Sequence, residues 1–216
     1  MKSHLDILTS LLHEKIVAIV RLDSGQHLVR AAEALLAGGI SVIEFTFSTA
    51  GVLDMLKEAS AHFGDKVLLG AGTVLDPETA RAAIEAGAQF IVTPSANLAT
   101  IALCKRYGRP IVAGAMTPTE IMTVWEAGAD LVKVFPASAV GGPDYIKAVL
   151  APLPQLRLVP TGGVSADNAA LYLKAGAAAV AVGGSLTDKK AVARGDWAAI
   201  TAEAERLVAA VRSVAA

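Results

Sequence analysis

The feature that most constrains the fold is a short apolar run that returns eight times along the chain. Each run is followed by turn residues and an amphipathic stretch, and runs are spaced at roughly 20 to 25 residues. Short apolar runs bounded by turn residues are typical of buried β-strands, and amphipathic stretches are typical of helices. The runs are Ile16–Val20, Ser41–Phe45, Val67–Gly70, Phe90–Val92, Ile111–Ala113, Leu131–Phe135, Leu156–Pro160 and Ala179–Val182.

Helix ends are marked by glycine and helix starts by capping residues. The text Ala-Gly-Ala closes three amphipathic stretches, at 86–88, 127–129 and 175–177. Glycine is favoured just past a helix end because it accepts a left-handed conformation. Asp76-Pro77 and Thr117-Pro118 each place a capping residue before helix-forming sequence. The order of elements is therefore strand, helix, strand, helix.

These strands are too apolar to face water on either side, which predicts a parallel sheet covered by helices. Closing eight such units gives an α/β fold of the (β/α)8 TIM barrel type. An open doubly wound sheet is the alternative, but it would usually contain fewer units at this length. We expect a single domain over 1–216, with an extra N-terminal helix near Leu5–Glu14 that caps the lower end. A last helix near Asp196–Val214 should pack outside.

Composition narrows the functional classes. Apolar residues make up 54% of the chain, and 19 basic and 20 acidic residues are well mixed. No basic run suggests nucleic acid, and no apolar stretch approaches the ~20 residues of a membrane span. The start lacks a signal-peptide core, so a cytoplasmic protein is expected. The single cysteine, Cys104, excludes an internal disulfide and a cysteine-based metal cluster. The four histidines fall in helix-like segments, so we expect neither a metal nor another cofactor.

Two charged residues interrupt buried runs. Lys133 lies in the sixth run and Glu44 in the second. A buried ammonium is costly unless it is paired or neutralised, and a lysine that readily loses its proton becomes a nucleophile. Because only helix packing lies outside a barrel strand, both side chains should point inward near the mouth. A lysine beside a general acid/base would follow. The structural alternatives are a lysine at a sheet edge and a buried ion pair that fixes the register.

Glycine-rich text ends the last two strands. Thr161-Gly162-Gly163 follows the seventh run and Gly183-Gly184-Ser185 the eighth. The corresponding loops of such barrels are the usual phosphate site, since glycine lets backbone N–H groups approach an anion. Ser185 adds a hydroxyl donor. The structural alternative is a pair of ordinary turns.

Other strand ends supply further candidates. Arg21 ends the first strand and offers a charged donor to a carboxylate or phosphate. Thr73 follows the third strand, and either residue could instead be an exposed strand end. Pro94 and Phe135 would supply apolar walls, although simple packing explains them equally well.

Together, the motifs V-I-E-F-T-F, G-A-G-T-V, V-K-V-F-P-A, P-T-G-G-V and G-G-S resemble the 2-keto-3-deoxy-6-phosphogluconate (KDPG) aldolase family. Its members are also described as 4-hydroxy-2-oxoglutarate (KHG) aldolases. The resemblance implies a metal-free class I aldolase, commonly a homotrimer, that cleaves KDPG to pyruvate and glyceraldehyde 3-phosphate. It further implies that Lys133 forms a Schiff base and Glu44 shuttles protons. Thr73 and an arginine would hold the pyruvate carboxylate, and Gly162, Gly163, Gly184 and Ser185 the phosphate.

One position departs from the family pattern. Many relatives carry an arginine shortly after the catalytic glutamate, where this chain has Ser48. Other relatives end the first strand with an arginine, so we interpret Arg21 as the carboxylate anchor. The open alternatives are the same chemistry on 2-keto-3-deoxy-6-phosphogalactonate or on unphosphorylated 4-hydroxy-2-oxoglutarate, a non-catalytic phosphosugar-binding or scaffold barrel, and a phosphosugar isomerase.

Overall fold

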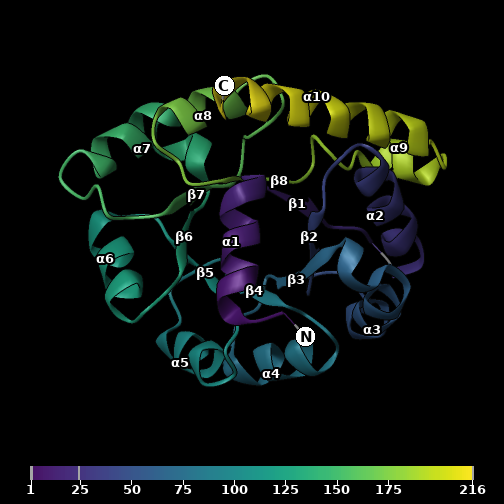
Figure 1. Ribbon diagram of the computed structural model, residues 1–216, viewed down its shortest axis with the longest axis horizontal. Coiled ribbons are helices and arrows are strands. Elements are labelled where there is room, and N and C mark those ends of the chain that lie inside the picture. Colours follow the sequence, from purple (N-terminus) through teal and green to yellow (C-terminus); the bar gives the residue numbers. More distant parts are fainter. Residues whose placement is uncertain (1, 24, 216) are drawn as a thin grey trace.

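The chain forms a barrel of eight parallel strands inside a ring of helices (Figure 1). The computed structural model describes residues 2–23 and 25–215. The strands are β1 (Ile16–Val20), β2 (Val42–Thr46), β3 (Leu68–Gly72), β4 (Phe90–Val92), β5 (Ile111–Ala115), β6 (Leu131–Val134), β7 (Leu158–Pro160) and β8 (Val180–Val182). Each predicted apolar run overlaps one of them, and β2, β3 and β5 extend one or two residues past their runs.

The strand order is β7-β6-β5-β4-β3-β2-β1-β8, so the first and last strands of the chain are neighbours. Between β7 and β8 the contact is narrower but present, because Thr161 and Ala181 form a parallel bridge. The Ala178 N–H also donates to the Leu158 carbonyl at 2.9 Å. The sheet thus closes almost completely, and the predicted (β/α)8 barrel is confirmed.

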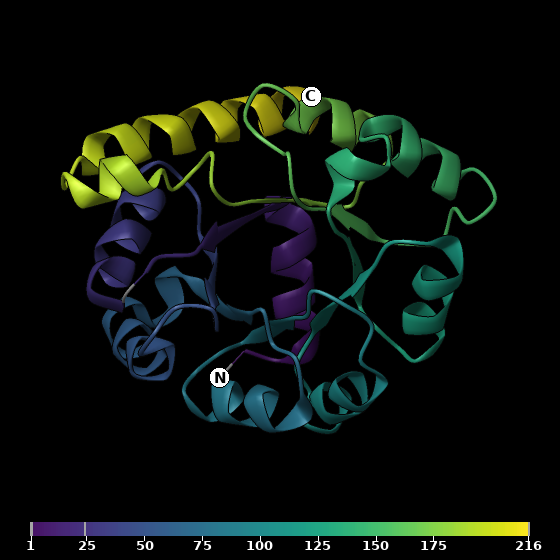
Figure 2. The ribbon, with the colours of Figure 1, turned by 180° about the vertical axis from the view of Figure 1, so that it is seen from behind.

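Helices surround the sheet on its outer side, as Figures 1 and 2 show from opposite ends. They are α1 (His4–Glu14), α2 (Leu28–Ala37), α3 (Val52–Phe63), α4 (Pro77–Glu85), α5 (Leu98–Arg106), α6 (Pro118–Glu126), α7 (Pro143–Leu150), α8 (Ala169–Lys174), α9 (Lys189–Ala193) and α10 (Trp197–Ala215). Three 3-10 turns join them: η1 (Gly25–His27), η2 (Gly64–Lys66) and η3 (Ala137–Val140). The short α9 was not predicted.

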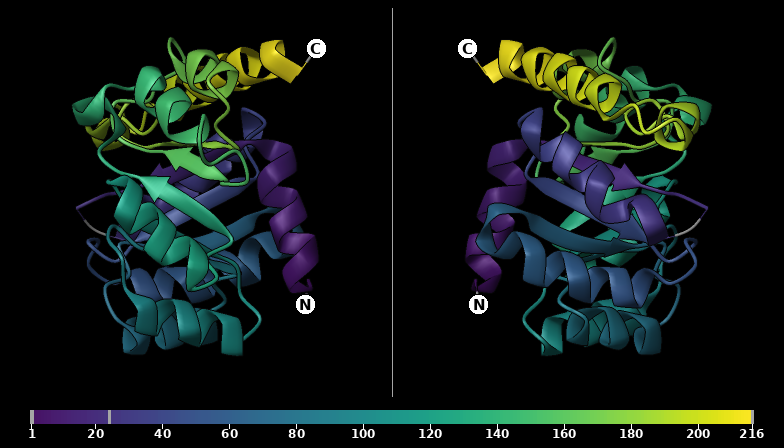
Figure 3. Two further views of the ribbon diagram at one scale, coloured as in Figure 1. Left: turned by 90° about the vertical axis from the view of Figure 1, so that its left-hand side faces the viewer. Right: turned by 90° about the vertical axis from the view of Figure 1, so that its right-hand side faces the viewer.

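Helix α1 closes the end of the barrel at which the strands begin, and Figure 3 shows it lying across that end, apart from the outer ring. Ile7 and Leu11 are fully buried against the inward side chains of the strands. The His4 imidazole also meets the Asp130 carboxylate, just before β6, at 2.7 Å. The predicted N-terminal cap is confirmed.

The long C-terminal helix α10 packs outside the barrel against α2, α8 and α9. Its amphipathic sequence buries one face, including Ile200, Ala204 and Leu207. In the part of the chain that the structure describes, no helix is long and apolar enough to cross a membrane.

Candidate active site

Lys133 and Glu44 point into the barrel because of the two-residue period of a strand. Leu131 and Val42, two positions earlier in β6 and β2, belong to the apolar cluster inside the barrel. Lys133 and Glu44 therefore lie one layer higher on the same inward faces. Both are buried, with 4% and 1% of their surfaces exposed. The structure thus brings together the two residues that interrupted the apolar pattern.

Glycine lies on the strands that neighbour these two side chains. In the strand register, Gly114 of β5 lies beside Lys133, and Gly70 of β3 lies beside Glu44. A Cβ atom on Gly72 would fall 1.6 Å from Oε1 of Glu44. Gly72 of the G-A-G-T text is therefore required by the buried carboxylate, whereas a Cβ on Gly70 would meet the Phe90 ring.

Burial changes the protonation of both groups. It lowers the pKa of Lys133 below its ordinary value, an effect that the Glu44 carboxylate opposes and the Arg21 guanidinium reinforces. Burial raises the pKa of Glu44, against the opposing charges of Lys133 and Arg21. Neither carboxylate oxygen of Glu44 has a hydrogen-bond partner among the described residues. Burial thus favours the neutral amine on Lys133 and the protonated carboxyl group on Glu44.

Lys133 opens into a cavity of about 640 Å³ at the C-terminal ends of β1, β6, β7 and β8. Eight of the predicted site residues line it: Arg21, Lys133, Phe135, Thr161, Gly162, Gly163, Gly184 and Ser185. The ring of Phe135 lies 5.2 Å from the Lys133 Nζ. A ligand bound here would therefore meet the amine, an aromatic wall and both glycine loops.

Three predicted site residues do not line this cavity. Glu44 lies beneath it, Thr73 follows β3, and Pro94 follows β4. Thr73 adopts a left-handed backbone conformation (φ 57°), which is strained for a residue with a branched side chain. Such strain is often found at functional sites. The Pro94 backbone packs so closely on Gly114 that a Cβ there would approach within 2.3 Å.

The two glycine loops differ in why they need glycine. Gly162 and Gly163 have φ values of 88° and 77°, which side chains other than glycine rarely adopt. Gly184 has no such constraint, and a Cβ there would have no protein atom within 4 Å. The fold itself does not require glycine at 184, whereas close approach of a ligand would.

Polar residues beyond the last strand also line the cavity, and sequence reasoning missed them. They are Thr187, Asp188, Lys189 and Lys190, at the start of α9. Asp188 caps α9 by accepting from the Ala191 N–H at 2.8 Å. Lys189 reaches across the rim to Asp23 at 2.6 Å. The sequence signal that could have found this segment is the pair of adjacent lysines that follows a glycine-rich strand end. The two lysines add positive charge to this side of the cavity.

Ser48 does not reach the cavity. Its hydroxyl meets the Thr46 hydroxyl at 3.0 Å, and the Thr46 hydroxyl lies 3.4 Å from that of Thr49. The Thr49 hydroxyl in turn accepts at 3.3 Å from the N–H of Leu22, the residue directly after Arg21. Where the family arginine is missing, a hydroxyl cluster thus ties the end of β2 to the segment that carries Arg21.

Comparison with known proteins finds aldolases that match most of this chain. The family model described as KDPG and KHG aldolase matches residues 7–203. The 2-dehydro-3-deoxy-phosphogluconate aldolase of Treponema pallidum (strain Nichols) is 39% identical over 189 residues, which is 87% of this chain and 89% of the relative. The 2-dehydro-3-deoxy-6-phosphogalactonate aldolase of Escherichia coli (strain K12) is 36% identical over 172 residues, or 79% and 83%.

A solved structure agrees with these relatives. It is a KDPG aldolase from Legionella pneumophila with pyruvate captured at low pH as a covalent carbinolamine intermediate. Its TM-score is 0.84 at 27% identity, covering 93% of this chain and 97% of that one. With the family model matching nearly the whole chain, this protein belongs to the KDPG and KHG aldolase family.

Proposed function

We propose that this protein is a class I aldolase that cleaves KDPG to pyruvate and glyceraldehyde 3-phosphate through a Schiff base on Lys133. One observation carries the proposal: a buried lysine whose pKa is lowered by burial opens into a cavity, and its charge interacts with the Glu44 carboxyl group, which has no hydrogen-bond partner among the described residues. An amine must be neutral to attack a carbonyl carbon, and burial lowers the pKa of this one, which favours its neutral form.

The first half of the reaction forms the covalent bond. The lone pair of the Lys133 Nζ attacks C2 of the keto acid, and proton transfer gives a carbinolamine. Protonated Glu44 then gives its proton to the carbinolamine hydroxyl, which leaves as water. The product is an iminium cation between Nζ and C2. The raised pKa of Glu44 supports its role as the acid in this step.

Cleavage follows from the charge on nitrogen. The Glu44 carboxylate takes the proton of the C4 hydroxyl, and the electrons of the C3–C4 bond move onto C3 and the iminium. Glyceraldehyde 3-phosphate leaves, and an enamine remains on Lys133. Protonation at C3 and hydrolysis by water then release pyruvate and regenerate the amine. In this scheme Glu44 gives the proton it took from the C4 hydroxyl to C3 of the enamine, and takes a proton from the hydrolytic water, so it ends protonated as it began.

The two anionic ends of the substrate have separate partners in this proposal. Arg21, which lines the cavity, and Thr73 would hold the carboxylate. Gly162, Gly163, Gly184 and Ser185 would cradle the phosphate through their N–H groups. Thr161 and Phe135 would line the pocket between, with Pro94 packed behind them against Gly114. A Cβ on Gly184 would have no protein atom within 4 Å. This open space supports a phosphate site there, because a bound ligand could fill it.

Trapping of the Schiff base tests the proposal. Reduction with borohydride in the presence of pyruvate should convert the iminium into a stable amine, and mass spectrometry should find the adduct on the peptide that contains Lys133. Folded wild-type protein that gains no adduct, or gains it on another lysine, would contradict the assignment.

The phosphogalactonate epimer is a second candidate substrate. Two features favour testing it: the similarity to the E. coli relative named for that activity, and the placing of Arg21 rather than residue 48 at the cavity. Comparing kcat/KM for the two phosphorylated epimers and for 4-hydroxy-2-oxoglutarate decides between them. The preferred epimer should lead the other by at least about 10-fold, which a single lost hydrogen bond produces.

We further propose a homotrimer. Leu75, Leu98 and Met116 are exposed at the mouth after β3, β4 and β5, and the Asn97 side chain links the first two of these loops through the Leu75 carbonyl. Exposed apolar side chains gathered on one side favour an interface. Light scattering after size exclusion should give three times the chain mass, and Leu75→Glu should lower it.

Two smaller expectations also belong to the proposal. We infer that residues 1–216 unfold as one domain, which predicts a single cooperative transition seen equally by fluorescence and circular dichroism. We infer a cytoplasmic location, which cell fractionation tests.

A further inference from the structure

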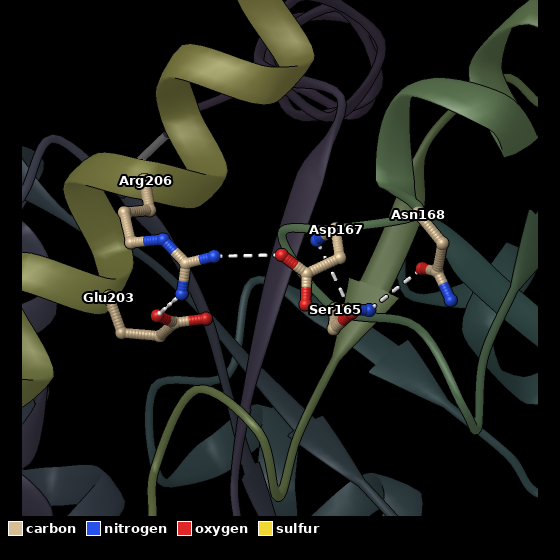
Figure 4. A network of polar contacts seen from close by, with 5 residues as sticks. All are labelled: Ser165, Asp167, Asn168, Glu203 and Arg206. Carbon is tan, nitrogen blue, oxygen red and sulfur yellow. Dashed lines mark hydrogen bonds and ion pairs between the residues drawn. The ribbon is translucent and has the colours of Figure 1, made fainter.

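Asn168, directly before α8, turns its side chain back into the glycine loop after β7. Its Nδ2 donates to the Gly163 carbonyl at 2.8 Å, and its Oδ1 accepts from the Ser165 N–H at 2.9 Å. Figure 4 shows the amide aimed at Ser165. Asn168 makes no side-chain cap to α8. One amide group therefore spans the loop and fixes two of its peptide units.

Fixing the carbonyls also fixes the N–H groups, because the C=O and the following N–H of a trans peptide point in opposite directions. The Gly162 carbonyl accepts from the Ser138 N–H at 3.2 Å, and the Gly163 carbonyl accepts from Asn168. The N–H groups of Gly163 and Val164 must then point away from these partners. Gly163 and Val164 both line the cavity.

The N–H groups of this loop divide into those in use and those left to a ligand. The Ser165 N–H is held by Asn168, so it is not available to a ligand. The Val164 carbonyl accepts from the Ser185 hydroxyl at 3.1 Å, which joins the loop after β7 to the loop after β8. No hydrogen bond between described residues uses the N–H of Gly162, Gly163 or Val164. These N–H groups are left as anion donors of this loop.

We propose that Asn168 is a positioning residue for the phosphate of the substrate: it holds the Gly163 carbonyl outward so that the Val164 N–H faces the phosphate. The proposal rests on the proposed function and names a residue that need not touch the substrate. The neighbouring Arg206 pairs with Asp167 at 2.8 Å and Glu203 at 2.6 Å (Figure 4), but these pairs are exposed to solvent. Exposed ion pairs contribute little, so the orientation of the Gly163 carbonyl depends on Asn168.

The test compares two phosphate-dependent readouts with one that is independent of phosphate. In Asn168→Ala, we expect KM for KDPG and Kd for inorganic phosphate, measured by calorimetry, to rise roughly 10-fold or more, the effect of a lost hydrogen bond to a charged group. Pyruvate carries no phosphate. The pyruvate concentration that gives half-maximal borohydride trapping should therefore differ from that of the wild type by less than about twofold.

Two further variants separate positioning from general stability. Asn97→Ala removes the same pair of contacts in another mouth loop, since Asn97 donates to the Leu75 carbonyl at 2.9 Å and accepts from the Thr100 N–H at 2.9 Å. Asn97 does not line the cavity, so KM for KDPG should stay unchanged. Asn168→Asp keeps the acceptor for the Ser165 N–H and loses the donor to Gly163, so it should weaken phosphate binding as Asn168→Ala does.

Three results would overturn the proposal. They are wild-type phosphate affinity in both Asn168 variants, an equal loss in phosphate binding and pyruvate trapping, and an equal effect of Asn97→Ala. Failure of the proposed function is distinguishable, because it would appear as wild-type protein that does not trap pyruvate. The calorimetric phosphate affinities of the variants would then still decide the role of Asn168.

Discussion

The two ends of the barrel are built from the same strands but differ in what fills them. At the closed end, inward residues such as Val42 and Leu131 pack with Ile7 and Leu11 of α1. One layer higher, the same strands carry Glu44 and Lys133, and glycine replaces larger side chains beside them. The closed end is thus filled by apolar side chains, whereas the mouth keeps space and charge.

The difference shows how one barrel separates stability from chemistry. Apolar packing at the closed end stabilises the fold, and this stabilisation offsets the unfavourable burial of an amine and a carboxyl group at the mouth. Substitutions at the closed end should therefore lower the free energy of unfolding, whereas substitutions at the mouth should lower the turnover.

The largest effect is expected for Lys133→Ala. Without the nucleophile, kcat/KM for KDPG should fall by roughly 10,000-fold or more, because the covalent route is lost. The free energy of unfolding should change far less than the turnover, since the buried amine is itself unfavourable but its removal leaves a cavity beside Glu44. Turnover and urea unfolding measured on the same protein check both claims. Activity retained within 10-fold would break the contrast between the ends.

Glu44→Gln should give the next largest effect on turnover. The amide cannot carry a proton, so kcat should fall roughly 100-fold to 10,000-fold, the range for a lost general acid/base. Trapping of the adduct on Lys133 should still occur, although more slowly. A variant with full kcat would show that another group moves the protons.

Leu131→Ala lies in the same strand as Lys133 but at the closed end. Leu131 is 1% exposed, so its truncation should lower the free energy of unfolding by about 2–5 kcal/mol. In the folded fraction, kcat should remain within about twofold of wild type. Urea denaturation and active-site titration measure the two quantities; a specific loss of kcat would mean that the ends are coupled.

Two glycine substitutions sharpen the comparison further. A Cβ on Gly70 would lie 2.3 Å from the Phe90 ring, so Gly70→Ala should destabilise the protein by about 1–3 kcal/mol. Gly184→Ala meets no protein atom within 4 Å and should change stability by less than about 0.5 kcal/mol, while raising KM for KDPG. Thermal unfolding and KM distinguish them, and an unchanged KM would argue against a ligand at Gly184.

The smallest effect is a shift in pH dependence. Burial lowers the pKa of Lys133 below its ordinary value of 10.5, so the rate of pyruvate trapping should rise with pH and level off below pH 10.5. Removing the Arg21 charge in Arg21→Leu should raise this pKa and move the plateau to higher pH. A plateau that moves to lower pH in this variant would contradict the assigned sign.

Sequence alone predicts the barrel well because each strand is an apolar run with a clear stop. Strand limits are less certain, since β3 extends to Gly72 and β5 to Ala115, beyond the predicted runs, where small residues give only a weak apolar signal. At the other extreme, Leu156 was expected in a strand, but β7 begins at Leu158. Lys133 and Glu44 were found because a charge inside an apolar run is conspicuous.

The remaining parts of the site depend on distances that a sequence does not contain. Lys189 and Lys190 resemble any exposed loop residues until β8 pairs with β1 and brings them to the same cavity as Arg21. Asn168 resembles a helix cap, and its contact with Gly163 depends on the turn that the chain makes there. The left-handed backbone of Thr73 is likewise visible only in three dimensions.

The closure of one end of the barrel by α1 has a kinetic consequence. Ile7 and Leu11 close one end of the barrel, and the cavity lies at the other end, where substrate would enter and both products would leave. In the proposed reaction the aldehyde must leave the cavity first, because the pyruvate carbons are still bonded to Lys133. Release is then ordered: pyruvate departs last and meets the same free enzyme as the next substrate, whereas returning aldehyde meets only the enamine.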